Sequence, residues 1–135
     1  MKTIRTLAAM AIVGVAAIGS GIGREAGAHH AVQAQFNVDR TDVFDGVLTR
    51  VELVNPHPQI YFDVKDKSGA KTSWRIEAPA IAALRRMGLM RILKVGDTYK
   101  VEYSPARNGE KNALMRAIVT SDGKRYGGSL QDVTQ

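Results

Sequence analysis

Histidine is scarce in this chain, and the positions of the three histidines suit the binding of a metal ion. They are His29, His30 and His57, which we name as candidate metal ligands. If the chain is cut after Ala28, His29 gains a free α-amino group beside its imidazole, and these two nitrogens can chelate one metal ion. His57 lies between two prolines and is the natural third donor, and a nitrogen-rich tetragonal site suits Cu(II). The alternative interpretation is a frayed polar N-terminus and one ordinary loop histidine.

Residues 1–28 have the pattern of a secretory signal peptide. Lys2 and Arg5 form a positive start, the apolar run 7–19 follows, and the segment ends on Ala-Gly-Ala at 26–28. This order of features directs export and cleavage. The run is shorter than the roughly 20 apolar residues of a spanning helix, so we expect a periplasmic or secreted protein with no stable membrane span after cleavage. An uncleaved anchor and a cut after Gly19 are the alternatives.

Composition narrows the classes of function. The chain has 135 residues, 44% hydrophobic and 24% charged, with no cysteine and a formal charge of +6. That length suits one domain, and the lack of cysteine excludes disulfides, zinc–thiolate sites, iron–sulfur clusters and cysteine nucleophiles. Both signs of charge alternate along the chain, which indicates a solvated surface and no nucleic-acid partner. Because no hydrolase elbow, phosphate loop or dinucleotide fingerprint occurs, we name no catalytic residue and do not expect an enzyme.

Hydrophobic periodicity predicts an all-β domain with one short helix. An irregular N-terminal segment, residues 29–42, precedes alternating strands near 43–54, 59–65, 71–77, 97–103 and 113–120, with a helix between Pro79 and Gly88. Three strands, a helix and two strands is the order of a five-stranded OB-fold-like Greek-key barrel. We assign the barrel to residues 43–123 and a polar C-terminal tail to 124–135. An open α+β sheet packed on one helix is the alternative.

The exposed side of the 59–77 hairpin offers candidate ligand-binding residues. Tyr61, Asp63 and Arg75 fall on the phase opposite the apolar positions. OB-folds use an aromatic residue beside cations, as Tyr61 is beside Lys65 and Arg75, to bind single-stranded nucleic acid, but export separates this protein from nucleic acid, so we expect another ligand on this face. The simpler interpretation is cross-strand ion pairing, in which Asp63 and Glu77 lie near Lys65 and Arg75.

Several motifs of the chain resemble one family of small exported bacterial proteins, titled domain of unknown function 6152. They are His29-His30, Phe36-x-x-Asp39, Gly46-Val47-x-x-x-Val51, Asn55-Pro56-His57, Asp63-Val64-x-Asp66-x-x-Gly69, Trp74-x-x-Glu77, Leu84-x-Arg86-x-Gly88, Leu93-Lys94-x-Gly96-Asp97 and Asp122-Gly123. Members commonly read His-His-Ser where this chain has Ala31. The resemblance implies an exported domain without an assigned activity and supplies no catalytic residues.

Two functional hypotheses follow from these observations. The first is a non-catalytic periplasmic binding module that binds copper, as Cu(II), through His29, His30 and His57. The second is a metal-free accessory protein that binds another exported protein, or a small organic ligand, on the barrel face at Tyr61, Asp63 and Arg75.

The first prediction concerns the start of the exported protein. Because the Ala-x-Ala site ends at Ala28, the mass of the secreted protein should correspond to a chain that begins with His29. A start at any other residue would remove the amine–imidazole chelate.

Overall fold

The structure, a computed structural model, describes residues 31–128. The predicted signal peptide, His29, His30 and the end of the predicted tail lie outside these residues. The strands are β1 (Asp42–Glu52), β2 (Gln59–Lys65), β3 (Lys71–Glu77), β4 (Thr98–Pro105), β5 (Asn112–Val119) and β6 (Arg125–Gly127), and the helices α2 (Ile81–Met87) and α3 (Leu89–Ile92) connect β3 to β4.

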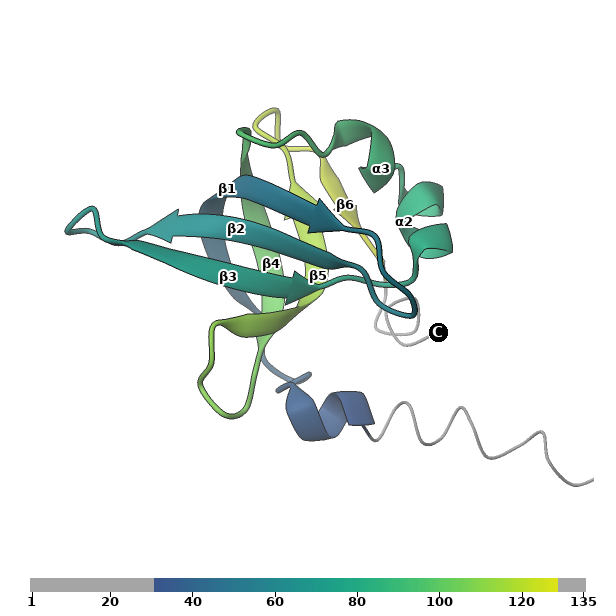
Figure 1. The fold of residues 1–135 in the computed structure, drawn as a ribbon, viewed down its shortest axis with the longest axis horizontal. Helices are drawn as coiled ribbons and strands as arrows, with labels where there is room; N and C mark the ends of the chain where they lie inside the picture. Colours follow the sequence, from purple (N-terminus) through teal and green to yellow (C-terminus); the bar gives the residue numbers. More distant parts are fainter. Residues whose placement is uncertain (1–30, 129–135) are drawn as a thin grey trace, which may run out of the picture.

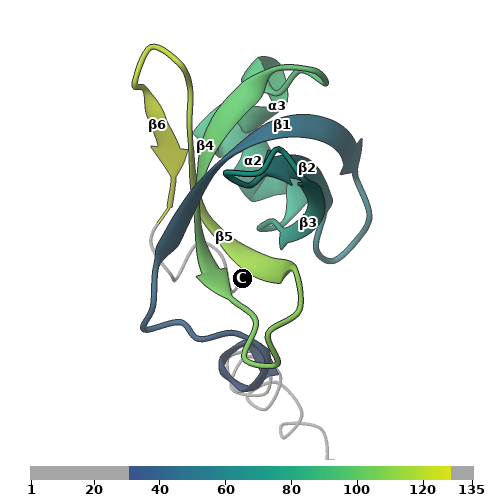
Figure 2. The same cartoon turned by 90° about the vertical axis from the view of Figure 1, so that its left-hand side faces the viewer.

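The strands close into a barrel. They form one sheet of order β3-β2-β1-β4-β5-β6, in which neighbours are antiparallel, and β3 also pairs in parallel with the start of β5. This last pairing joins the two ends of the β1–β5 sheet, as Figures 1 and 2 show from two sides. The predicted five-stranded barrel is therefore confirmed, and the alternative of an open sheet is wrong.

Three local predictions differ from the structure. Residues 31–35 are helical instead of irregular. The predicted single helix is followed by a second short helix, α3, and a sixth strand, β6, occupies part of the predicted polar tail. In each case apolar residues gain contacts from parts of the chain that are distant in sequence, so tertiary packing decides the local structure. Tyr126 of β6, for example, packs against the main core.

Gly46 allows β1 to bend tightly around the barrel. A side chain at this position would begin 3.0 Å from a ring carbon of Phe44 and 3.1 Å from Cβ of Phe62. Because any side chain here would force Phe44 or Phe62 to shift by a few tenths of an ångström, the close approach of these residues favours glycine. The register of β1 against β2 also shifts between Leu48 and Arg50, and a bulge of this kind increases the local bend.

One apolar core fills the barrel interior. Alternate residues of the strands point inward, so that Leu48, Phe62 and Ile76, for example, are completely buried. The helices α2 and α3 lie at the barrel end where β3 finishes (Figure 1) and add Leu84 and Leu89 to the same core. Within the part of the chain that the structure describes, neither helix is long and apolar enough to cross a membrane.

The turn between β2 and β3 is fixed by the carboxylate of Asp66. The Asp66 carboxylate accepts hydrogen bonds from the Ser68 hydroxyl at 2.6 Å, the Ser68 amide at 2.8 Å and the Ala70 amide at 3.0 Å. The Ser68 hydroxyl makes the largest contribution, and these bonds together lower the pKa of Asp66. The turn sets the register of the hairpin, which pairs Gln59 with Glu77.

An aromatic cluster joins β1, β3 and β4. The rings of Phe44, Trp74 and Tyr103 lie with their centroids 5.0–5.3 Å apart in tilted orientations, a spacing at which aromatic pairs attract one another. Tyr103 is 7% exposed. Burial, assisted by the negative charge of Asp42, raises the pKa of the Tyr103 hydroxyl.

The second prediction follows from the raised pKa of the Tyr103 hydroxyl. The unfolded chain loses the tyrosine proton at a pH of about 10, below the raised folded pKa, so stability falls as the pH rises through that interval. Tyr103→Phe has no such proton. In urea unfolding followed by Trp74 fluorescence, the difference in free energy of unfolding between variant and wild type should be constant at neutral pH and should shift in favour of the variant above pH ~10. A difference that stays constant into alkaline pH would contradict the prediction.

Candidate functional site

His57 lies in the loop between β1 and β2, beside a carboxylate from β3. Its Nδ1 atom is 3.9 Å from Oε1 of Glu77, and the two side chains are 31% and 18% exposed. The Gln59 side-chain amide donates a hydrogen bond to the carbonyl of His57 at 3.1 Å. With a proline on each side, the loop backbone has restricted freedom. The imidazole is thus positioned at the edge of the barrel and remains accessible.

Glu77 is a site residue that the sequence analysis missed, because it was assigned to an ion pair within the hairpin. A signal was present in the sequence. A turn at Asp66–Gly69 fixes the antiparallel register, and that register places Glu77 opposite Gln59. His57 is only two residues before Gln59, so the hairpin itself brings the carboxylate close to the imidazole.

The predicted ligand-binding residues do share one face. Tyr61 and Asp63 alternate with the buried residues of β2, and Tyr61 pairs across the strands with Arg50 and Arg75. Residues directly opposite one another on neighbouring strands point to the same side of a sheet. Tyr61, Asp63 and Arg75 therefore lie together on the outer face of β1–β3.

Most polar groups of this outer face already have partners within the protein. The Tyr61 hydroxyl donates to the Glu52 carboxylate at 3.0 Å, and the Arg50 guanidinium lies 3.9 Å from the centroid of the Tyr61 ring. Arg50 also forms an ion pair with Glu52 at 3.0 Å. These contacts hold the aromatic ring between charged groups and leave its hydroxyl engaged.

The expected cross-strand ion pairs of the hairpin do not form among the described residues. Glu77 contacts His57 instead of Lys65 or Arg75. The Arg75 side chain donates to the Asn112 side-chain carbonyl at 3.4 Å, and its backbone amide donates to the carbonyl of Lys111. The reason is barrel closure, which places β5 beside β3 and offers Arg75 a partner that the hairpin alone lacks.

The N-terminal segment is attached to the outside of the barrel. Phe36 is fully buried and packs with Ala106 and Leu114, and Val32 and Val38 pack against them; we call these five residues the outer cluster. Backbone hydrogen bonds fix the same segment, for example from the Asn37 amide to the carbonyl of Pro105 at 2.9 Å.

A second anchor is Arg107, in the loop between β4 and β5. Its side chain donates to the carbonyl of Gln33 at 2.7 Å, and its backbone amide donates to that of Gln35 at 3.0 Å. Figures 1 and 2 both show the helical residues 31–35 beside this loop. The position of the first described residues is thus determined by β5 and its preceding loop.

The outer cluster lies next to the His57–Glu77 pair. Leu114 belongs to the outer cluster and is the direct parallel partner of Glu77. Neighbouring strands are about 5 Å apart, and Ile76 and Ala113, the preceding pair, both point into the core. Leu114 and Glu77 therefore point side by side to the outer side of the sheet, where Leu114 is buried within the outer cluster and Glu77 lies near His57.

The described residues bring together two side chains with donor atoms that could bind a metal ion, His57 and Glu77. No group of three or more histidine or acidic side chains suited to a metal ion occurs within residues 31–128. His57 and Glu77 provide one nitrogen and one carboxylate donor. His29 and His30, the other predicted ligands, lie outside the described residues, immediately before Ala31.

Comparison with known proteins gives a family but no function. A family model described as a family of unknown function, DUF6152, matches residues 18–116. No curated protein and no solved structure matches the chain significantly.

The third prediction tests the attachment of the N-terminal segment. Phe36→Ala removes the largest side chain of the outer cluster, so the free energy of unfolding should fall by about 3 kcal/mol. In hydrogen exchange, the amides of Phe36 and Asn37 should lose their protection. Val43→Ala, at a position that is 53% exposed, is the matched control and should change stability by less than about 0.5 kcal/mol. Equal effects of the two substitutions would contradict the described packing.

Proposed function

Because the chain belongs to the DUF6152 family, whose function is unknown, we propose a function from its own residues: it is a non-catalytic exported binding module that binds Cu(II). The ligands are the α-amino group and imidazole of His29, the imidazole of His30, and His57. Glu77 assists His57. Export to the periplasm, with cleavage after Ala28, is part of the proposal because it creates the free amine.

The strand pair of Glu77 and Leu114, which links the His57–Glu77 pair to the outer cluster, is the observation that carries this proposal. Val32 packs on the outer cluster, and Leu114 of that cluster is the strand partner of Glu77. His29 precedes Val32 by three residues, and three residues span at most about 10 Å. Leu114 and Glu77 belong to neighbouring strands about 5 Å apart. We therefore infer that the residues before Val32 carry their donors to the side of the barrel on which His57 lies.

The chemistry of the donors favours Cu(II). Imidazole and amine nitrogens in a tetragonal arrangement are a copper site, and Cu²⁺ binds such ligands more tightly than the other divalent first-row metals. Glu77, 3.9 Å from Nδ1 of His57, favours the tautomer with its proton on that nitrogen. Nε2 then remains free to bind the metal.

A metal-free accessory role is the second candidate, and the outer face of β1–β3 favours it. Tyr61 lies between Arg50 and Arg75 in one cross-strand row, and an aromatic ring flanked by cations can hold a planar or acidic group of an exported protein or small ligand. Such a ligand would compete with the contact between Tyr61 and Glu52. This internal engagement is why we rank copper binding first.

The fourth prediction compares copper binding by the mature protein and its His57→Ala variant. Loss of one of the nitrogen donors should weaken Cu(II) binding at least about tenfold in calorimetric titration. Electron paramagnetic resonance of the bound copper should show one nitrogen fewer. Asp45→Asn, which alters an exposed carboxylate on β1, is the control and should bind as the wild type does.

Equal affinities of wild type and His57→Ala would refute His57 as a copper ligand. Retained affinity after acetylation of the N-terminal amine would refute the chelate. If copper does not bind at all, while a periplasmic partner is recovered by wild type and lost by Tyr61→Ala, the metal-free accessory role is correct.

A further inference from the structure

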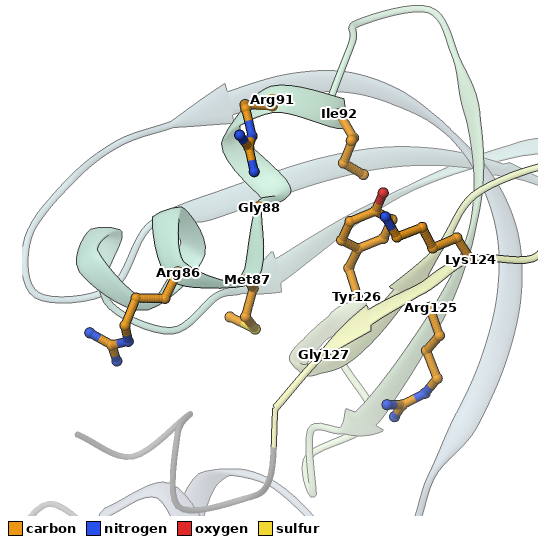
Figure 3. A pocket seen from close by; sticks show the side chains of 9 residues that line it. All are labelled: Arg86, Met87, Gly88, Arg91, Ile92, Lys124, Arg125, Tyr126 and Gly127. Atoms are coloured by element: carbon orange, nitrogen blue, oxygen red, sulfur yellow. The ribbon is translucent and has the colours of Figure 1, made fainter.

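A groove between the helices and β6 collects positive charge that the proposed copper site does not use. It lies between α2, α3 and the β5–β6 turn and has a volume of about 450 Å³, within the range of small-molecule sites. Among the described residues that line it, none is acidic. We call it the basic groove and define it by Arg86, Arg91, Lys124 and Tyr126, which Figure 3 shows with their neighbours.

The charges of the basic groove come from separate elements and form no ion pair within residues 31–128, although the Asp122 carboxylate lies near Lys124 and interacts with its charge. Arg86 belongs to α2, Arg91 to α3, and Lys124 immediately precedes β6. No ion pair of these three occurs among the described residues, whereas the neighbouring Arg125 pairs with Glu102 at 2.9 Å. Arg91 and Lys124 repel each other unless an anion lies between them, whereas the Arg86 side chain points away from these two (Figure 3).

Two of these cations converge on an aromatic floor. The Lys124 ammonium lies 5.0 Å from the centroid of the Tyr126 ring. Gly88 lies beside the Tyr126 ring and has the left-handed conformation, with φ +81°. A side chain at this position would begin 3.6 Å from Nη2 of Arg91 and 3.8 Å from a carbon of the Tyr126 ring. Because Gly88 has no side chain, the space beside its Cα is open, and both the Arg91 guanidinium and the Tyr126 ring border this space.

The remaining floor is apolar. Met87 and Ile92 line the groove beside Tyr126, and Figure 3 shows the Met87 side chain directed toward the space below Gly88. A thioether and an aromatic ring give an adaptable, polarisable surface against which a hydrocarbon or aromatic group can pack. An inorganic ion alone would leave this surface uncovered.

We propose that the basic groove binds a small organic anion. Its phosphate or carboxylate group lies between Arg91 and Lys124, and its apolar or aromatic body packs on Tyr126 and Met87. The planar guanidinium of Arg91 can donate two parallel hydrogen bonds to such a group, and the Lys124 ammonium adds a point charge. A soluble phosphate ester and the headgroup of an anionic lipid offer this same chemistry.

The test uses phenyl phosphate as the soluble probe and phosphatidylglycerol vesicles as the lipid probe, with inorganic phosphate for comparison. Two-dimensional NMR of the wild type should show saturable shifts of the Gly88 and Gly127 amides with phenyl phosphate, and inorganic phosphate should bind more weakly.

The double variant Arg91→Gln/Lys124→Gln should weaken binding about tenfold. The matched double variant Lys67→Gln/Lys71→Gln, which removes the same charge from the exposed ends of the β2–β3 hairpin, should bind as the wild type does. Trp74 fluorescence checks that both variants fold.

Each outcome has a stated meaning. Binding of phenyl phosphate that depends on Arg91 and Lys124 supports a soluble ligand. Binding only to phosphatidylglycerol vesicles, with the same dependence, supports a lipid headgroup. Equal losses in the two double variants, shifts confined to residues outside the groove, or no binding of either probe would overturn the proposal.

Discussion

The parallel pairing of β3 with β5 is the constraint on which the other features of the molecule depend. It closes the barrel, so that Ile76 and Ala113 face the core while Glu77 and Leu114 point side by side to the outer side of the sheet. Without this pairing, no strand contact would place Leu114 beside the β2–β3 hairpin. With it, the surface that receives the N-terminal segment and the loop that carries His57 become neighbours. A protein without cysteine cannot fix such a juxtaposition with a disulfide, and strand pairing with apolar packing takes that role.

The outer cluster attaches the N-terminal segment to the barrel by apolar packing in the same way. Phe36 is buried as completely as the residues of the main core, although it precedes the first strand. Apolar burial holds the segment, and the hydrogen bonds from Arg107 and Asn37 set its direction. A flexible chain end pays a large entropic cost when it joins a ligand site, and a segment already attached three residues away reduces that cost.

The barrel could be predicted from the sequence because the patterns that mark its strands and turns are local. Alternation along β2 and β3, the Asp66–Gly69 turn and the proline-bounded stop after β1 can all be recognised within a few residues. The helical residues 31–35 and the strand β6 could not be predicted in this way. Phe36 and Tyr126 show why, since their partners are brought to them only after the barrel has closed.

The candidate site was predictable to a similar extent. His57 was identified because histidine is scarce in the chain and because a proline flanks this one on each side. Tyr61 and Arg75 were identified because they alternate with the apolar residues of the hairpin. Glu77 was misassigned because charge alternation within a hairpin indicates ion pairs between its strands, and the true neighbours come from the β1–β2 loop and from β5. The cations of the basic groove, spread between residues 86 and 124, are brought together only by the folded chain.

The central claim is that one copper ion meets both the N-terminal segment and the His57 loop. Paramagnetic broadening of amide NMR signals by substoichiometric Cu(II) tests this most directly, because broadening falls steeply with distance from the ion. The signals of His57, Glu77 and Val32 should disappear together, while those of the distant β2–β3 turn remain. Broadening restricted to the first residues of the chain, with His57 and Glu77 unaffected, would contradict the claim.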